Sequence, residues 1–332
     1  MCKLILSADI GKDGTKMVGK VIDENCILID EANDNNIKYV DFPTMKYDLE
    51  DGFIEVQGNS FMVDYNNEKY IIGEQGEEKS YDTSKTNLIH KLCAYTGITQ
   101  YLKPGTKGNK VYMVLACPLS VLQIDEAKEE YKNFIKGEGE INIKVNGSEY
   151  YFTIEDITIK AEGSGILYLD MEKFKGKNVA IIDLGGLNMG FSLYINGVCK
   201  KSNRWIEECG NNRLIEIIRE ETIKYRKGNL ISYEQAGQAL KRGYLLEKGK
   251  VDEESKRYIN MAKERYLNEV NGYIVKHKFN IDEIDLVTFV GGTSTVVKEQ
   301  IENSINHAEV SDEARLTTVK GLFRVANTKY NR

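Results

Sequence analysis

The sequence has few of the residues that build metal sites and covalent cross-links. It contains six cysteines without any Cys-x-x-Cys pair and only three histidines, so a zinc site is not expected. The scattered thiols, read as inert, and the lack of a secretory signal predict a reducing, cytoplasmic setting. No apolar run approaches the roughly 18 residues of a transmembrane helix, so no membrane contact is expected.

An excess of positive charge is also missing. The chain has 45 Lys and Arg residues against 51 Asp and Glu residues, which gives a net charge of −6. This balance disfavours nonspecific binding to DNA through net charge. The chain of 332 residues, 41% hydrophobic, is long enough for two domains of about 150 residues each. Three prolines beside 29 glycines predict many tight turns.

One pattern occurs twice. An apolar run ends in Asp9 and is followed by Gly11 and Gly14, and a second apolar run ends in Asp183 and is followed by a Gly-Gly pair. Each copy predicts a β-hairpin with a glycine-rich turn. The sequence therefore predicts an internal duplication at the level of the fold.

The residue types in these turns suit a nucleotide phosphate chain bound with Mg²⁺. Glycine lets backbone N–H groups approach phosphate closely. Asp9 and Asp183 are expected to hold Mg²⁺ through its waters, and Lys16 to neutralise phosphate charge. Taken singly, each turn would be an ordinary hairpin turn, so the matched pair carries the argument. The expected phosphate-binding residues are Gly11, Gly14, Thr15, Lys16, Gly185, Gly186 and Asn188.

A third element lies downstream, where the apolar run after Asp285 leads into Gly291, Gly292 and Thr293. A buried strand, a Gly-Gly turn and a helix are expected here. Such a backbone can lie against a base or ribose, and a helix N-terminus favours nearby anions. A common strand–turn–helix connection is the alternative.

Apolar periodicity outlines the remaining elements. A small β-rich insertion is expected over about 42–82. Strands are expected at 3–9, 17–29, 37–41, 52–56, 60–64, 68–73, 111–117, 141–159, 179–184, 190–196 and 284–290. Helices are expected at 83–102, 125–136, 166–174, 209–225, 232–247, 253–278, 295–306 and 317–327.

Together these motifs resemble the actin/Hsp70/sugar-kinase ATPase superfamily, and within it the bacterial actin-like plasmid-segregation proteins of the ParM/StbA type. The three glycine motifs match in order, and lesser matches lie at 114–119, 160–165 and 317–323. The resemblance spans nearly the whole chain, although its specificity lies in about 30 residues. It implies an α/β, two-lobe fold of duplicated ribonuclease-H-like domains with a nucleotide cleft between them. Lobe I would comprise 1–174 and 318–332, and lobe II 175–317.

The resemblance also assigns roles to further residues. It places the catalytic acid that orients water at Glu162, with Asp9 and Asp183 as the other catalytic residues. On the adenosine side, the segment 232–244 offers Glu234 and Lys241 besides the Gly-Gly-Thr motif, with an exposed amphipathic helix as the alternative, and Gly210 is a further candidate contact to sugar or phosphate. The sequence departs from the family where Leu187 and Asn188 follow the second glycine pair and where Cys117 replaces a glycine.

The function implied is a Mg²⁺-dependent ATPase that polymerises head to tail on binding ATP, or GTP, and disassembles after hydrolysis. It would segregate plasmid DNA through a DNA-binding adaptor protein, without binding DNA itself. Two alternatives share the fold: a non-polymerising small-molecule kinase, and a scaffold that binds ATP without turnover.

Overall fold

The computed structural model describes residues 2–22, 37–49 and 54–331. They form two compact units, each described by itself below. Unit 1 is Met1–Asp170 with Thr318–Arg332, and unit 2 is Met171–Thr317. The sequence had placed the first boundary after residue 174 and the second after 317. None of the described helices has the length and apolar character that a membrane span requires.

Unit 1 is built on one nine-stranded sheet in the order β3-β2-β1-β7-β9-β8-β5-β6-β4. β1 pairs antiparallel with β2 and parallel with β7. β7 in turn runs parallel to β9. The strands are β1 (Lys3–Ile10), β2 (Thr15–Val21), β3 (Lys38–Phe42), β4 (Lys46–Asp48), β5 (Ser60–Tyr65), β6 (Glu68–Gly73), β7 (Asn109–Cys117), β8 (Ile141–Val145) and β9 (Ser148–Ala161).

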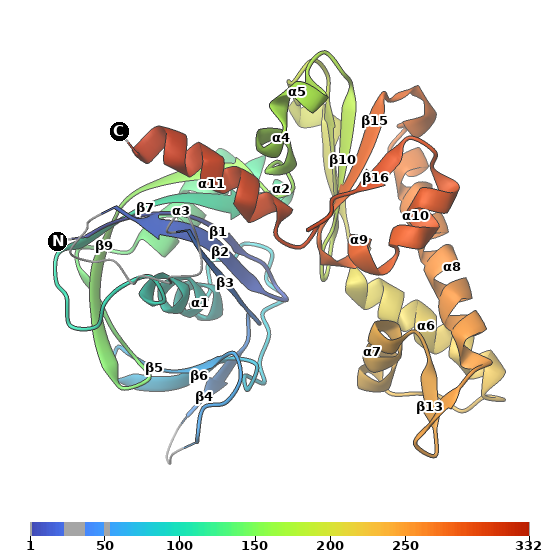
Figure 1. The fold of residues 1–332 in the computed structure, drawn as a ribbon, viewed down its shortest axis with the longest axis horizontal. Coiled ribbons are helices and arrows are strands. Elements are labelled where there is room, and N and C mark those ends of the chain that lie inside the picture. Colours follow the sequence, from blue (N-terminus) through green and yellow to red (C-terminus); the bar gives the residue numbers. More distant parts are fainter. Residues whose placement is uncertain (1, 23–36, 50–53, 332) are drawn as a thin grey trace. The chain divides into compact units, whose positions relative to one another are not determined.

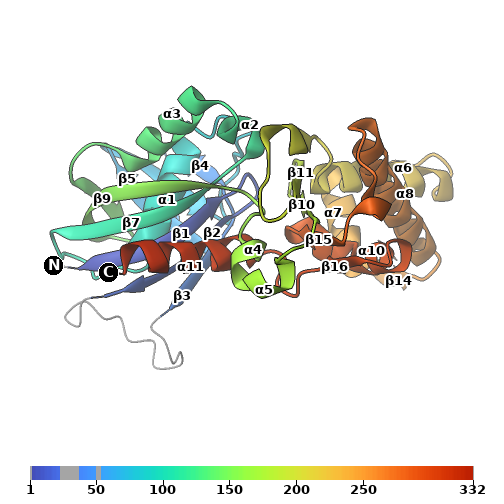
Figure 2. The ribbon, with the colours of Figure 1, turned by 90° about the horizontal axis from the view of Figure 1, so that it is seen from above.

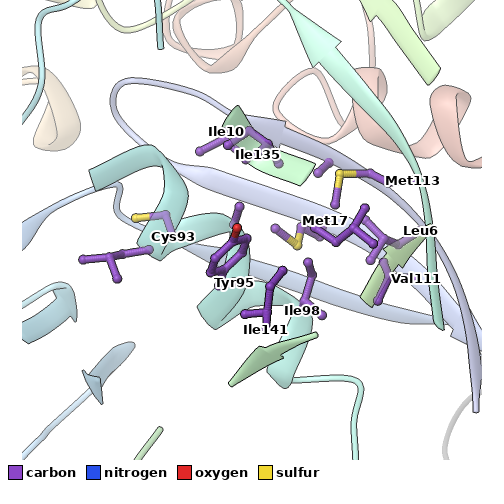
Figure 3. Packing of buried hydrophobic residues seen from close by; sticks show 14 of the residues in the cluster. Leu6, Ile10, Met17, Cys93, Tyr95, Ile98, Val111, Met113, Ile135 and Ile141 are labelled. Atoms are coloured by element: carbon purple, nitrogen blue, oxygen red, sulfur yellow. The ribbon is translucent and has the colours of Figure 1, made fainter. Parts of the chain in front are cut away.

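The sheet of unit 1 curls around helix α1 (Leu88–Thr99), as Figure 1 shows. Alternate side chains of β1, such as Leu6 and Ile10, join Tyr95 and Ile98 of α1 in one hydrophobic core (Figure 3). This alternation follows from the two-residue period of a strand. α3 (Asp125–Lys136) adds Ile135 to the same core.

The opposite face of β1 and β7 is covered by α11 (Thr317–Tyr330) (Figure 2). The Ser7 hydroxyl donates to the Val319 carbonyl at 2.6 Å, and Tyr112 packs against Tyr330. Because both faces of these central strands are covered, β1 is apolar along most of its length. The final helix expected over 317–327 is therefore integral to unit 1.

The β-rich insertion expected over 42–82 is not set apart. Its strands β4, β5 and β6 belong to the nine-stranded sheet, because β5 pairs with β8. Val63 and Ile72 lie in the same core as α1. For the strand expected over 52–56, residues 52 and 53 lie outside the described residues, and residues 54–56 form no strand. For the strand expected over 17–29, residues 23–29 also lie outside the described residues. β4 was missed because three residues are too few to show a period.

Unit 2 has a five-stranded sheet in the order β12-β11-β10-β15-β16. β10 pairs antiparallel with β11 and parallel with β15, so the order repeats that of β3-β2-β1-β7-β9 in unit 1. The duplication expected from the sequence is thus present as topology. The strands are β10 (Val179–Leu184), β11 (Met189–Tyr194), β12 (Arg204–Glu207), β15 (Leu286–Val290) and β16 (Ala308–Val310), with a separate β13 (Leu245–Glu247) and β14 (Lys250–Asp252) hairpin.

Helices α6 and α8 contribute to the core of unit 2. Ile218 of α6 and Tyr266 of α8 are fully buried with Ile182 of β10. On their polar sides, Arg213 makes two hydrogen bonds to Glu269, at 2.8 and 2.7 Å. The helices of unit 2 are α5 (Met171–Phe174), α6 (Asn211–Tyr225), α7 (Tyr233–Arg242), α8 (Ser255–Lys276), α9 (Gly292–Val296) and α10 (Lys298–Ser304).

Two expected helices are each divided. The helix expected over 166–174 is α4 (Ile166–Leu169) and α5, because Asp170 between them has a non-helical backbone, at φ −147° and ψ 80°. The helix expected over 295–306 is α9 and α10, separated by Val297 at φ −110°. Apolar spacing does not reveal one such residue inside a helical pattern. The short helix α2 (Leu119–Leu122) follows Pro118.

Candidate functional site

The first glycine-rich turn connects β1 and β2. The Gly11 N–H donates to the Gly14 carbonyl at 3.0 Å, which closes a four-residue turn. Asp9 stands opposite Lys16 in the strand register. A Cβ on Gly11 would lie 3.0 Å from the Gly14 carbonyl oxygen. Such a contact is tight, so this position favours glycine.

The second turn has the same geometry. It connects β10 and β11, and the Gly185 N–H donates to the Asn188 carbonyl at 2.9 Å. Asp183 stands opposite Gly190. A Cβ on Gly185 would lie 3.2 Å from the Asn188 carbonyl oxygen. Each unit therefore has one closed hairpin turn with an aspartate near the end of its first strand.

Polar side chains of the first turn interact with one another. The Lys16 ammonium lies 3.1 Å from an Asp9 carboxylate oxygen, and both side chains are about seven-eighths buried (14% and 13% exposed). Lys16 was expected to neutralise phosphate, and in this structure it pairs with the residue expected at the metal. Asp13, whose charge would oppose phosphate, pairs with Lys79 at 3.0 Å.

Thr15 does not present its hydroxyl to the turn. It is fully buried, and its hydroxyl lies 2.9 Å from that of Thr44. The sequence pattern could not separate this orientation from a phosphate contact, because Thr15 is both a polar residue of the motif and the first residue of β2. We therefore leave Thr15 out of the phosphate-binding residues proposed below.

The N-terminus of α6 docks on the second turn. The Asn211 N–H donates to the Gly185 carbonyl at 2.9 Å, and the Asn212 N–H donates to the Gly186 carbonyl at 3.0 Å. A Cβ on Gly210 would come within 2.5 Å of the Leu187 backbone. Gly210, expected at the adenosine, thus has a packing role that its sequence position did not reveal.

The third glycine motif also packs on the second turn. Gly291 has φ +89° and ψ 156°, and a Cβ there would lie 2.4 Å from a carboxylate oxygen of Asp183. The Thr293 hydroxyl donates to the Gly185 carbonyl at 2.9 Å. Gly292 begins α9, and a Cβ there would lie 3.8 Å from Arg315. The motif expected to contact adenosine therefore supports the turn and its aspartate.

Replacement of Thr293 by Val tests that support. The change removes the hydroxyl donor at nearly constant volume, while Gly185 keeps the hydrogen bond from Asn211. We expect the free energy of unfolding of unit 2 to fall by about 1 kcal/mol. Urea titration followed by Trp205 fluorescence, which reports on unit 2, measures this loss. Thr293→Ser keeps the donor, so its free energy of unfolding should fall by less. An equal loss of stability in both variants would contradict the role of the hydrogen bond.

Glu162 directly follows β9 in unit 1. Its backbone N–H donates to the Cys117 carbonyl at 2.9 Å, and its half-buried carboxylate forms an ion pair with Lys85. No sequence pattern marks Lys85, which lies in a polar segment between Ser84 and Thr86. One lysine among turn residues gives no signal that its side chain is buried.

The surroundings of this ion pair are polar and buried. Burial would lower the pKa of Lys85, but attraction to Glu162 and other groups outweighs it, so the pKa is raised. His90, the third residue of α1, is fully buried, and burial together with the Lys85 charge lowers its pKa to about 3. The His90 imidazole is thus neutral near pH 7.

This depressed pKa predicts an acid sensitivity. Unfolded chains protonate histidine near pH 6.5, whereas folded His90 remains neutral to about pH 3. The unfolded state therefore binds the extra proton, and stability falls as the pH drops through this window, by at most about 1.4 kcal/mol per pH unit from this group. Urea titrations from pH 7 to 4 should show a shallower loss in His90→Gln. Equal slopes in both proteins would contradict a buried, neutral imidazole.

The remaining expected contacts lie on α7. Glu234 and Lys241 are both exposed, seven residues apart and so on similar faces of the helix. Tyr233 ties the start of α7 to the start of α6, because its hydroxyl donates to Asn212 at 2.7 Å. This contact connects α7 to the helix that docks on the second turn.

The donor set suits a metal that keeps its waters. Within the part of the chain that the structure describes, no group of three His, Cys, Asp or Glu side chains lies close enough to hold a metal directly. Mg²⁺ is commonly held by one or two carboxylates with several waters. Asp9 in unit 1 and Asp183 in unit 2 each lie near the end of a buried strand, and each carboxylate by itself suits that chemistry.

Comparison with known proteins places this geometry in context. Residues 7–165 match the N-terminal domain of actin-like proteins. The chain is 47% identical to the protein in the Alp12 filament structure, covering 99% of both chains at a TM-score of 0.70. No curated protein matches.

More distant structures share the fold. An archaeal actin homologue, Ta0583, is 14% identical at a TM-score of 0.77, covering 99% of this chain and all of its own, and it has also been solved in complex with ADP. The ParM of a 15-stranded filament from Clostridium botulinum is 16% identical at a TM-score of 0.72, covering 98% and 99% of the two chains.

Proposed function

This chain belongs to the family of actin-like proteins, and we propose that it is an ATPase that assembles into filaments on binding nucleotide. The observation that carries the proposal is the 47% identity to the Alp12 filament protein over 99% of both chains. The two matched glycine turns support the nucleotide part of it. ATP is the proposed nucleotide, with GTP as a possible substitute.

We assign the phosphate contacts to both turns. Backbone N–H groups of Gly14 and Gly186 would face phosphate oxygens, with Asn188 as a side-chain donor. Gly11 and Gly185, whose N–H groups close the two turns, would let the phosphates approach the backbone closely because they lack Cβ. Lys16 would divide its charge between Asp9 and the phosphates. Mg²⁺ bound through water to Asp9 and Asp183 would neutralise developing negative charge. Gly291, Gly292, Glu234 and Lys241 remain the proposed adenosine contacts, whereas Gly210 and Thr293 support the second turn.

Hydrolysis needs positioning more than covalent chemistry from the protein. Glu162 would accept a hydrogen bond from a water molecule and direct its oxygen at the γ-phosphorus. The new P–O bond forms as the bond to the β–γ bridging oxygen breaks, giving ADP and inorganic phosphate. A water-orienting carboxylate is worth about 10²–10⁴-fold in rate.

Filament turnover would follow from the same reaction. Identical head-to-tail contacts that do not close generate an open polymer, and release of phosphate would weaken them. We propose that such a polymer moves plasmid DNA through a DNA-binding adaptor protein. The net charge of −6 favours an adaptor over direct DNA binding.

Sedimentation with different nucleotides tests this function. The purified protein is spun with Mg-ATP, Mg-GTP, Mg-ADP or no nucleotide, and released phosphate is measured in parallel. We expect pelleting with triphosphate and little with ADP. If the protein stays in the supernatant at every concentration, with or without triphosphate, the filament proposal is contradicted. Formation of ADP that requires an added sugar or acid acceptor, with the phosphoryl group transferred to that acceptor and no free phosphate released, would instead identify a kinase.

A further inference from the structure

We propose that Lys85 is a positioning residue that holds the Glu162 carboxylate in place for hydrolysis. The inference rests on the proposed function, because it assigns Glu162 to the water. It adds a residue that no sequence motif identified.

The ion pair is unequal in burial. The Lys85 side chain is 3% exposed, whereas the Glu162 side chain is 26% exposed. Burying an ammonium is unfavourable unless a partner compensates it. An ion pair of lysine and glutamate at the surface would not require the ammonium to leave water. The arrangement therefore restrains the Glu162 carboxylate from its buried side and leaves its other side accessible.

The backbone of Lys85 is also unusual. Lys85 has φ +59°, in the left-handed region that side chains rarely adopt. Of the eight non-glycine residues with positive φ in the described ranges, it is the one that is buried. Such backbone persists only where the surrounding structure holds it, and it concentrates at functional sites.

A hydrogen-bond network fixes the segment around Lys85. The Ser84 backbone N–H donates to Asp82 at 2.8 Å, and the Ser84 hydroxyl lies 2.8 Å from that of Thr86. The Asn87 side chain caps α1 by accepting from the His90 N–H at 3.2 Å. Lys85 is thus held between a tight turn and a helix start, which makes its ammonium a fixed point.

Two further side chains help to define the charge at this point. The hydroxyl of Tyr131 and the Nε2 atom of His90 are buried without a hydrogen-bond partner. Both groups interact electrostatically with Lys85. The histidine is neutral, and burial raises the pKa of the Tyr131 hydroxyl, so it is neutral too. Of Lys85, His90 and Tyr131, Lys85 is therefore the charged residue, and its ammonium balances the negative charge of Glu162.

Steady-state hydrolysis of Lys85→Met tests the inference. Methionine keeps much of the length and apolar stem but removes the ammonium. We expect kcat to fall about 10–100-fold, the range for misplacing a reacting group by about 1 Å, with KM for Mg-ATP nearly unchanged. Lys85→Arg, which keeps the charge, should recover part of kcat. Lys85→Met should add little to Glu162→Gln, because the two residues act as one unit.

A matched control is available in the same unit. Lys46 is also buried and pairs with Asp48 and Glu78, outside the proposed site. Lys46→Met should alter stability but leave kcat near the wild-type value. If Lys85→Met does not fold, Lys85→Asn serves in its place, because asparagine tolerates the left-handed backbone.

Each outcome separates the two proposals. If the wild type hydrolyses ATP and folded Lys85→Met or Lys85→Asn has an unchanged kcat, the positioning role is wrong while the ATPase stands. A raised KM with unchanged kcat would make Lys85 a binding residue and also overturn it. If the wild type releases no phosphate although it binds ATP, the proposed function itself fails, and the inference with it.

Discussion

Glu162→Gln is expected to slow phosphate release by about 10²–10⁴-fold while filaments still form. The carboxylate is proposed to orient the attacking water, and an amide of the same shape is a much weaker acceptor. The proposed nucleotide contacts do not include this side chain, so assembly should be intact and filaments should persist. Light scattering recorded together with phosphate release measures both effects in one sample.

Glu155→Gln is the matched control. Glu155 lies on the same strand, β9, and its carboxylate is 3.8 Å from Lys110 in an exposed ion pair. Its variant should behave as wild type, because exposed pairs contribute little to stability. Equal rates of hydrolysis in Glu162→Gln and the wild type would remove Glu162 from the reaction.

Gly291→Ala is expected to destabilise unit 2 by more than about 3 kcal/mol and to abolish tight binding of Mg-ATP. The added Cβ would lie 2.4 Å from both a carboxylate oxygen of Asp183 and the Leu184 carbonyl oxygen. The backbone at φ +89° and ψ 156° is itself unfavourable for alanine. Asp183 and the turn after it would have to move together.

Gly228→Ala separates the two causes. Gly228 has φ +92° in the same unit, but a Cβ there meets nothing within 4 Å. This variant carries the backbone penalty alone, of about 1–3 kcal/mol, and should bind nucleotide normally. Urea titration and calorimetry with Mg-ATP give both values. If the two variants lose equal stability and both bind, the contact with Asp183 has no role.

The fold was largely predictable because its central features are local. The matched hairpin turns after Asp9 and Asp183, and the resemblance they carry, lead to the actin-like fold that the relatives share. The curling of β5 and β6 back to β8 was not predictable, because pairing over about 80 residues leaves no short-range pattern. For the same reason, the sequence indicated a separate insertion where the structure has one continuous sheet.

The candidate site was less predictable at the level of side chains. Motif spacing indicated which backbone forms the turns, but not that Thr15 faces Thr44 or that Thr293 holds the second turn. Those roles depend on which way a side chain points and on tertiary neighbours. Lys85 shows the limit most clearly, since its buried ammonium pairs with Glu162, 77 residues away in the chain.

One binding measurement tests most directly the claim that the two matched turns serve a single nucleotide. Calorimetry with Mg-ATP, below the concentration of assembly and on the Glu162→Gln background, gives the stoichiometry for the parent and for Asp9→Asn and Asp183→Asn. We predict one nucleotide per chain, with either substitution weakening that single event. The claim would be contradicted if the chain bound two nucleotides and each substitution removed one of them. It would also be contradicted if neither substitution changed binding.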